Sequence, residues 1–117
     1  MSYGNVGWRN FRKKSMKTLD ILVVRIYITE ASHLLNKIID YLKNDKISGL
    51  SVFRAIAGIG ESGDLSLSLL DLSLNLPITV EFFDYNKDKV LRALEHLHQF
   101  INPGHIIFWD AKVIVTD

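Results

Sequence analysis

The apolar residues of this chain fall into six segments between residues 19 and 115, and their spacing limits the fold more than any other feature. Continuous or alternating runs rich in β-branched residues are typical of strands, whereas apolar residues three or four positions apart indicate helices. The segments therefore predict the order strand, helix, strand, strand, helix, strand. Their ranges are Leu19–Ile28, Leu34–Leu42, Leu50–Ala57, Leu76–Phe83, Val90–Ile101 and Ile106–Val115.

The two predicted helices are bounded by residues that favour helix ends. Ser32 is available to cap the first helix, and Ile47-Ser48-Gly49 ends it. Asp84 or Asn86 can cap the second helix, and Asn102-Pro103-Gly104 closes it. Their apolar faces consist of Leu34, Leu35, Ile38, Ile39 and Leu42 in the first helix and of Val90, Leu91, Leu94, Leu97 and Ile101 in the second.

This order of elements predicts an α+β fold of the ferredoxin-like class. A βαββαβ chain of this kind forms a sandwich with two helices on one face of a four-stranded antiparallel sheet. In the first strand, Leu22, Val24, Ile26 and Ile28 share one face and are expected to pack under the helices. Pro77 opens the third strand, where its missing N–H can be tolerated.

The opposite sheet face is only partly polar. Alternation places Arg25 among Ile21, Val23 and Tyr27 on the first strand and places Glu81 beside Phe83 on the third. We expect Arg25 and Glu81 to lie within salt-bridge reach, because these strands are neighbours in this fold. An apolar sheet face of this kind usually packs on a partner, so we expect self-association through it.

Length and charge indicate one domain with a basic tail. At 117 residues the chain is long enough for a single core, which we assign to residues 19–117. Residues 1–18 hold five Lys or Arg and no acid, whereas the remainder has nine Lys or Arg against thirteen Asp or Glu, a balance of −4. With Trp8 and Phe11 the tail can touch nucleic acid or a membrane surface, or pack on a neighbouring subunit. Short arms are more often solvated or disordered extensions, so nucleic acid is not the partner we expect.

Several kinds of protein are excluded by composition. No cysteine is present, so disulfides and thiolate chemistry are ruled out. The apolar runs Ile21–Val24 and Ile26–Ile28 are far shorter than the roughly 20 residues of a membrane span. Without an apolar leader, a cytoplasmic location is expected.

A glycine-rich segment, Arg54-Ala-Ile-Ala-Gly-Ile-Gly-Glu-Ser-Gly-Asp64, lies between the second and third predicted strands. Gly58, Gly60 and Gly63 can expose backbone N–H groups to an anion, although loop flexibility explains the same glycines. Arg54 can grip a phosphate or carboxylate, or form an ion pair with an acid such as Glu61 or Asp64. Both alternatives remain open from the sequence.

The sequence contains no residue pattern typical of a catalytic site or a metal site. His96 and His98 are two residues apart on a predicted helix, so they point in nearly opposite directions and cannot chelate one ion from that element. No spacing indicates a serine, histidine and acid triad or a catalytic carboxylate pair. We therefore expect neither an enzyme nor a metal site.

Three segments resemble the PII-like proteins, in particular the family called domain of unknown function 190. They are Val24-Arg-Ile-Tyr-Ile28, Arg54–Gly63 and Asn75-Leu-Pro-Ile-Thr-Val-Glu-Phe-Phe-Asp84. The resemblance covers about residues 19–115, and it implies a ferredoxin-like homotrimer. PII proteins are signalling proteins that bind adenine nucleotides between subunits and contact target proteins through the long loop between the second and third strands.

Two functions follow as hypotheses. The first is a sensor of a small anionic metabolite, such as ATP or ADP, bound between subunits, with loop 61–75 contacting a protein target. Its site residues would be Arg54, Gly58, Ile59, Gly60, Glu61, Ser62 and Gly63. The second is a ligand-free trimeric interaction module that uses the leucines between residues 65 and 74. For the sensor, we expect Glu61–Leu74 to be the most mobile part of the body.

Overall fold

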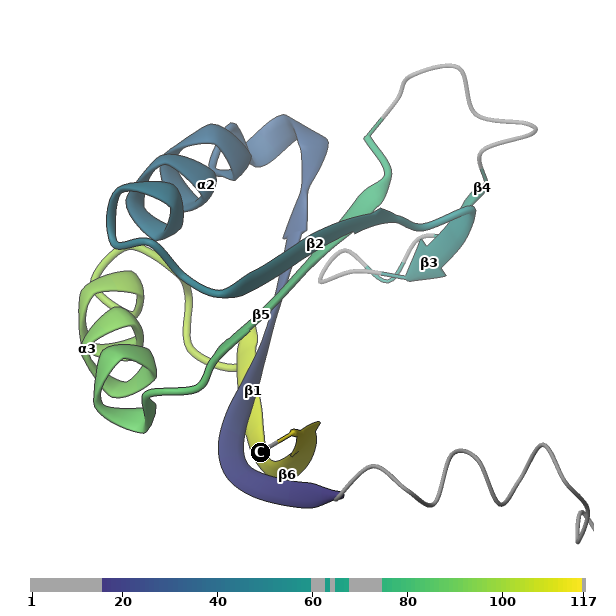
Figure 1. The fold of residues 1–117 in the computed structure, drawn as a ribbon. Coiled ribbons are helices and arrows are strands. Elements are labelled where there is room, and N and C mark those ends of the chain that lie inside the picture. The colour runs from purple at the N-terminus through teal and green to yellow at the C-terminus, as the bar shows by residue number, and fades with distance from the viewer. Residues whose placement is uncertain (1–15, 60–62, 64, 68–74, 117) are drawn as a thin grey trace, which may run out of the picture.

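A computed structural model describes residues 16–59, 63, 65–67 and 75–116. A four-stranded antiparallel sheet with strand order β2-β5-β1-β6 forms one layer, and both α-helices lie together on one of its sides (Figure 1). This confirms the predicted fold class. The elements are β1 (Lys17–Thr29), the 3-10 turn η1 (Glu30–Ser32), α2 (Leu35–Asn44), β2 (Gly49–Arg54), β3 (Ala57–Ile59), β4 (Leu65–Leu67), β5 (Pro77–Asp84), α3 (Lys87–Leu97) and β6 (Ile106–Val115).

The core lies between the helices and the two central strands, β1 and β5. All four inward residues predicted for β1 are buried there, and Phe82 of β5 is fully enclosed. The helices contribute one apolar stripe each, because the residues that repeat every three or four positions face the sheet. The fully buried helical residues are Ile38 and Leu42 from α2 and Val90, Ala93 and Leu97 from α3.

On the other side of the sheet, which we call the open sheet face, none of the described residues forms a helix (Figure 1). Arg25 and Glu81 pair directly across β1 and β5, and Arg25 Nε lies 2.8 Å from Glu81 Oε1, which confirms the predicted pair. The Arg25 guanidinium also lies 5.6 Å from the ring centre of Trp109. By strand register this face comprises Val23, Arg25, Tyr27, Ser51, Phe53, Thr79, Glu81, Phe83, Ile107 and Trp109. Ile21, predicted to share it, is buried.

The helix ends differ in part from the prediction. Ser32 does not cap α2: it belongs to η1, its hydroxyl donates to the Thr29 carbonyl at 2.7 Å, and the N-cap is Leu34. For α3, Asn86 is the cap and accepts from the Asp88 N–H, whereas Asp84 precedes the cap by two residues and binds other donors. This helix ends at Leu97, so the predicted extension to Ile101 is wrong, although Ile101 is still buried in the core.

The second predicted strand, Leu50–Ala57, is divided in two. Strand β2 ends at Arg54, and Ala57–Ile59 form β3, which pairs with β4 in a separate two-stranded sheet. Gly58 and Ile59 are therefore in a strand, where the sequence indicated a loop.

At the other end of the body β1 begins at Lys17, two residues before the predicted start. Residues 1–15 of the tail lie outside the described part. Within that part, no helix is long and apolar enough to cross a membrane.

Candidate ligand site at the loop base

Arg54 ends the edge strand β2, and its side chain turns to η1. Its Nη2 lies 2.5 Å from Oε1 of Glu30, the residue that follows β1. The side chain of Arg54 is 54% exposed and that of Glu30 is 24% exposed. Glu61 and Asp64, the ion-pair partners that the sequence suggested for Arg54, both lie outside the described residues. An anion can therefore reach the guanidinium from solvent, but a carboxylate of the protein already contacts it.

Backbone hydrogen bonds fix the surroundings of this pair. The Glu30 N–H donates to the Leu76 carbonyl at 3.2 Å, and the Ala55 N–H donates to the Pro77 carbonyl at 2.9 Å. The Asn75 side-chain oxygen accepts from the Ala31 N–H at 3.2 Å. Three separate segments thus meet where the connection between β4 and β5 enters the sheet. We call this region, comprising Glu30, Ala31, Arg54, Ala55, Asn75, Leu76 and Pro77, the loop base.

Gly58 approaches the loop base more closely than any other residue type could. A Cβ atom built on it would lie 2.5 Å from Cγ of Pro77, well inside van der Waals contact. This close packing of β3 on Pro77 gives a structural reason for glycine at position 58 that requires no ligand. Gly63 differs, since it adopts a φ of 79°, which favours glycine, and a Cβ there would meet no atom within 4 Å.

The other predicted site residues are divided between described and undescribed parts. Ile59 is in β3 and well exposed, whereas Gly60, Glu61 and Ser62 lie outside the described residues. Glu30 and Asn75 were missed as members of this region. Their positions follow from strand register, because Thr29 pairs with Pro77 and Arg54 pairs with Ile78. The spacing of residues within each segment does not predict which residues pair across neighbouring strands.

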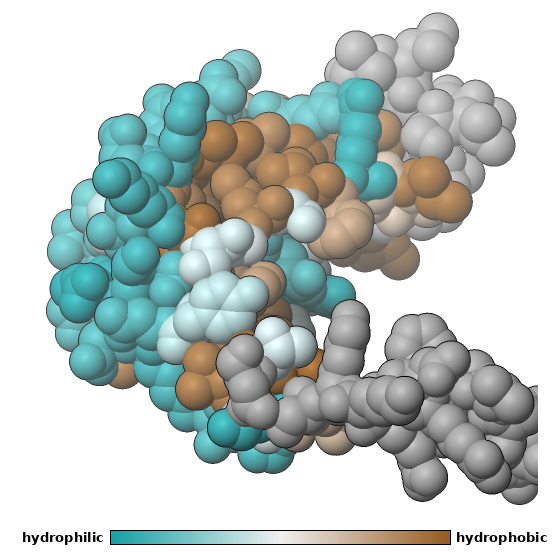
Figure 2. Space-filling model, in the orientation of Figure 1, coloured by the Kyte–Doolittle hydropathy of each residue, from teal (hydrophilic) through white to brown (hydrophobic). Residues whose placement is uncertain are grey.

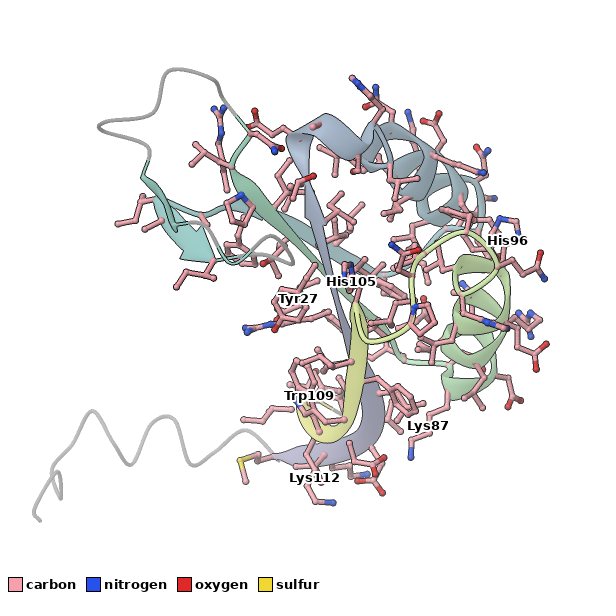
Figure 3. The ribbon with its side chains drawn as sticks, turned by 180° about the vertical axis from the view of Figure 1, so that it is seen from behind. Tyr27, Lys87, His96, His105, Trp109 and Lys112 are labelled. Carbon is pink, nitrogen blue, oxygen red and sulfur yellow. The ribbon has the colours of Figure 1, made fainter. Side chains whose placement is uncertain are left out.

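A hollow with a volume of about 360 Å³ lies at the end of the sheet opposite the loop base. It is lined by Asp20, Lys87, Asp110, Ala111 and Lys112, and its charges are already paired. Lys112 Nζ contacts Asp20 at 2.6 Å, and this hydrogen bond lowers the pKa of Asp20, while Lys87 contacts Asp110 at 3.5 Å. Figure 3 shows Lys87 and Lys112 near this end, away from the loop base. A hollow with self-neutralised charges offers little to a simple anion.

The histidines in the described part do not form a metal site. His96 stacks on Tyr41 with ring centres 4.0 Å apart and meets Phe100 edge-on at 5.7 Å, so it belongs to an aromatic cluster between α2 and α3. Within the same residues no group of three or more histidine, cysteine or acidic side chains is arranged to hold a metal ion.

Comparison with known sequences decides the family. Residues 16–113 match the profile of domain of unknown function 190, DUF190, described as "Uncharacterized ACR, COG1993". The chain belongs to this family. Two relatives are similar over most of their length. A UPF0166 protein of Methanocaldococcus jannaschii is 32% identical over 78% of this chain and 89% of its own. A UPF0166 protein of Aquifex aeolicus is 30% identical over 85% of this chain and 98% of its own.

Solved structures place this DUF190 chain in the PII-like fold. CPII of Thiomonas intermedia, a nitrogen regulatory PII-like protein, matches with a TM-score of 0.59 and 15% identity over 85% of this chain and 98% of its own. That CPII structure was solved bound to ADP, AMP and bicarbonate. A protein of Thermus thermophilus described as PII-like matches with a TM-score of 0.55 and 18% identity over 86% of this chain and 92% of its own. At these identities the likeness shows the fold.

Proposed function

We propose that this DUF190 protein is a PII-like regulatory protein that senses a small anionic ligand at the loop base and acts through a protein target. The observation that carries the proposal is the half-exposed side chain of Arg54 at the point where three segments meet. Arginine is well suited to phosphate and carboxylate groups, because its planar fork donates several hydrogen bonds. The protein acts by binding rather than by catalysis.

An adenine nucleotide is the ligand we propose first. The PII-like CPII of the same fold was solved with ADP and AMP, which supports this choice of chemistry. The proposed site consists of Arg54, Gly58, Ile59 and Gly63, together with residues 60–62. Loop 61–75 would report occupancy, since a ligand that contacts one loop arrangement more than another shifts the population toward it.

Assembly into a homotrimer is part of the proposal, and the open sheet face supports it. Tyr27, Phe53, Ile107 and Trp109 are all more than one-third exposed on or beside this face. Figure 2 shows apolar surface gathered beside the hydrophilic helical side. In Figure 3, Tyr27 and Trp109 lie on the side of the sheet away from His96 of α3. Exposed apolar area of this extent commonly marks an interaction surface.

Binding is tested by calorimetric titration with ATP, ADP and AMP. We expect the unmodified protein to bind at least one of them and Arg54→Ala to bind it at least tenfold more weakly, since a hydrogen bond between charged groups contributes about 1.5–3 kcal/mol. Arg92→Ala is the matched control, because Arg92 is an exposed arginine on α3 away from the loop base. Equal affinities of the unmodified protein and Arg54→Ala would contradict the site.

A ligand-free interaction module is the second candidate. It is favoured by Phe53, Ile56 and Ile59, three well-exposed apolar side chains at and just beyond the end of β2. Such a cluster can contact another protein without any small ligand. Absence of binding to all three nucleotides, with an intact fold and trimer, would favour this module over the sensor.

A further inference from the structure

We propose that Glu30 is an internal competitor for the ligand: its carboxylate occupies Arg54 until an anion replaces it. This inference rests on the proposed function, since it concerns the regulation of the same site. It assigns a role to a residue outside the glycine-rich segment. Glu30 would set how tightly the protein binds anions, and its release would carry the binding event to η1.

The geometry of the pair is that of an anion bound to arginine. The Glu30 carboxylate approaches the Arg54 guanidinium to 2.5 Å, as the oxygens of a bound phosphate or carboxylate would. A ligand oxygen and the Glu30 oxygen therefore compete for the same donor. The pair is also reachable, because more than half of the Arg54 side chain is exposed to solvent. Ion pairs in such surroundings are weak, so a ligand with further contacts can displace the carboxylate.

The backbone holds Glu30 in this competing position. Its N–H is bonded to the Leu76 carbonyl, and the next N–H, of Ala31, is bonded to the Asn75 side chain. The carboxylate therefore does not have to be brought to Arg54 from a mobile segment. When an anion takes its place, Glu30 stays nearby and can return to Arg54 as soon as the anion leaves.

Release of Glu30 has a structural consequence on the helical side. The contact between Arg54 and Glu30 joins the end of β2 to η1, and only His33 and Leu34 separate η1 from α2. Loss of this contact would loosen η1 while Arg54 is held by the ligand. Ligand binding at the end of β2 would then change the structure at the start of α2, where a partner protein can bind.

Calorimetric titration of four proteins and one control variant with ADP, ATP and inorganic pyrophosphate tests this inference. The four proteins are the unmodified protein, Glu30→Gln, Arg54→Ala and the double variant Arg54→Ala/Glu30→Gln. Glutamine keeps the backbone bond of residue 30 and the size of its side chain but removes the charge. We expect Glu30→Gln to bind about three- to fivefold more tightly than the unmodified protein, the factor that corresponds to an exposed ion pair. Glu95→Gln, an exposed acid on α3, is the matched control and should change nothing.

The double variant distinguishes competition from a general charge effect. If Glu30 acts through Arg54, the double variant should bind no more tightly than Arg54→Ala alone. A gain from Glu30→Gln of the same size in both backgrounds would overturn the inference. Hydrogen exchange adds a readout independent of affinity: saturating ADP should speed exchange of the Glu30 and Ala31 amides in the unmodified protein.

Failure of this inference and failure of the proposed function give different results. If the unmodified protein binds ADP, Arg54→Ala weakens binding and Glu30→Gln leaves it unchanged, the site stands and the competitor role is wrong. If neither the unmodified protein nor Glu30→Gln binds any of the three probes, the proposed sensor is wrong and this inference falls with it. Binding by Glu30→Gln alone would support both.

Discussion

At the scale of single residues, the side chain of Asp84 holds together the segment between α2 and β2 and the segment between β5 and α3. The residue is 3% exposed, and its carboxylate accepts hydrogen bonds of 2.9 Å from the Ser48 N–H, the Ser48 hydroxyl and the Asn86 N–H, with Lys89 Nζ at 3.5 Å. Burial raises the pKa of Asp84, but these hydrogen bonds and the lysine outweigh it, so the pKa lies below its ordinary value. We expect Asp84→Asn to lower the free energy of unfolding by about 1–3 kcal/mol in urea denaturation at pH 7, because an amide nitrogen would face donors.

The pH dependence of this effect has a definite sign. A depressed pKa in the folded state contributes stability above the unfolded pKa, and that stability is lost as the pH falls through the folded value. The stability gap between the unmodified protein and Asp84→Asn should therefore narrow below about pH 4. Asp110→Asn is the control, since this acid is 82% exposed and should change stability by less than about 0.5 kcal/mol. A gap that stays constant as the pH is lowered through the acid range would contradict the assigned role.

At the scale of elements, the contact between Gly58 and Pro77 ties β3 to the start of β5. A methyl group at position 58 would lie 2.5 Å from the proline ring, so either the ring or β3 must shift. We expect Gly58→Ala to cost about 1–3 kcal/mol and to speed hydrogen exchange at Ile59. Pro77→Ala should relieve the clash, so the double variant should lose less stability than the sum of the single variants. Strictly additive losses would show that the glycine is needed for another reason.

At the scale of the whole molecule, the open sheet face should hold the subunits together. We expect sedimentation at micromolar concentration to give about three times the 13.4 kDa of one chain. Ile107→Asp should shift this equilibrium toward monomer, because it places a charge on an apolar interface. Leu91→Asp on α3 is closely matched, with Leu91 46% exposed and Ile107 44% exposed, and should remain trimeric. A monomer for the unmodified protein, or dissociation by both variants alike, would contradict assembly through this face.

The sequence by itself determined which residues of the central strand β1 face the helices and which face away. Period-two alternation set Val24 and Ile26 toward the helices and set Arg25 on the other side, opposite Glu81 once β1 and β5 pair. Asn86, one of the two caps predicted for α3, is a local feature of the same kind, since its side chain accepts a hydrogen bond from an amide two residues away. These features depend on neighbours in the chain, which is why spacing and residue type predicted them.

Only the tertiary structure decided the arrangement of the loop base. The sequence could not place Glu30 against Arg54, because the two are far apart in the chain and meet only through the pairing of β5 with both β1 and β2. For the same reason the predicted second strand ran past Arg54. In the structure the Ala55 N–H donates to the Pro77 carbonyl, and the chain then turns into β3. Spacing encodes the face of each side chain, whereas contacts between distant segments depend on strand register and on how each strand ends.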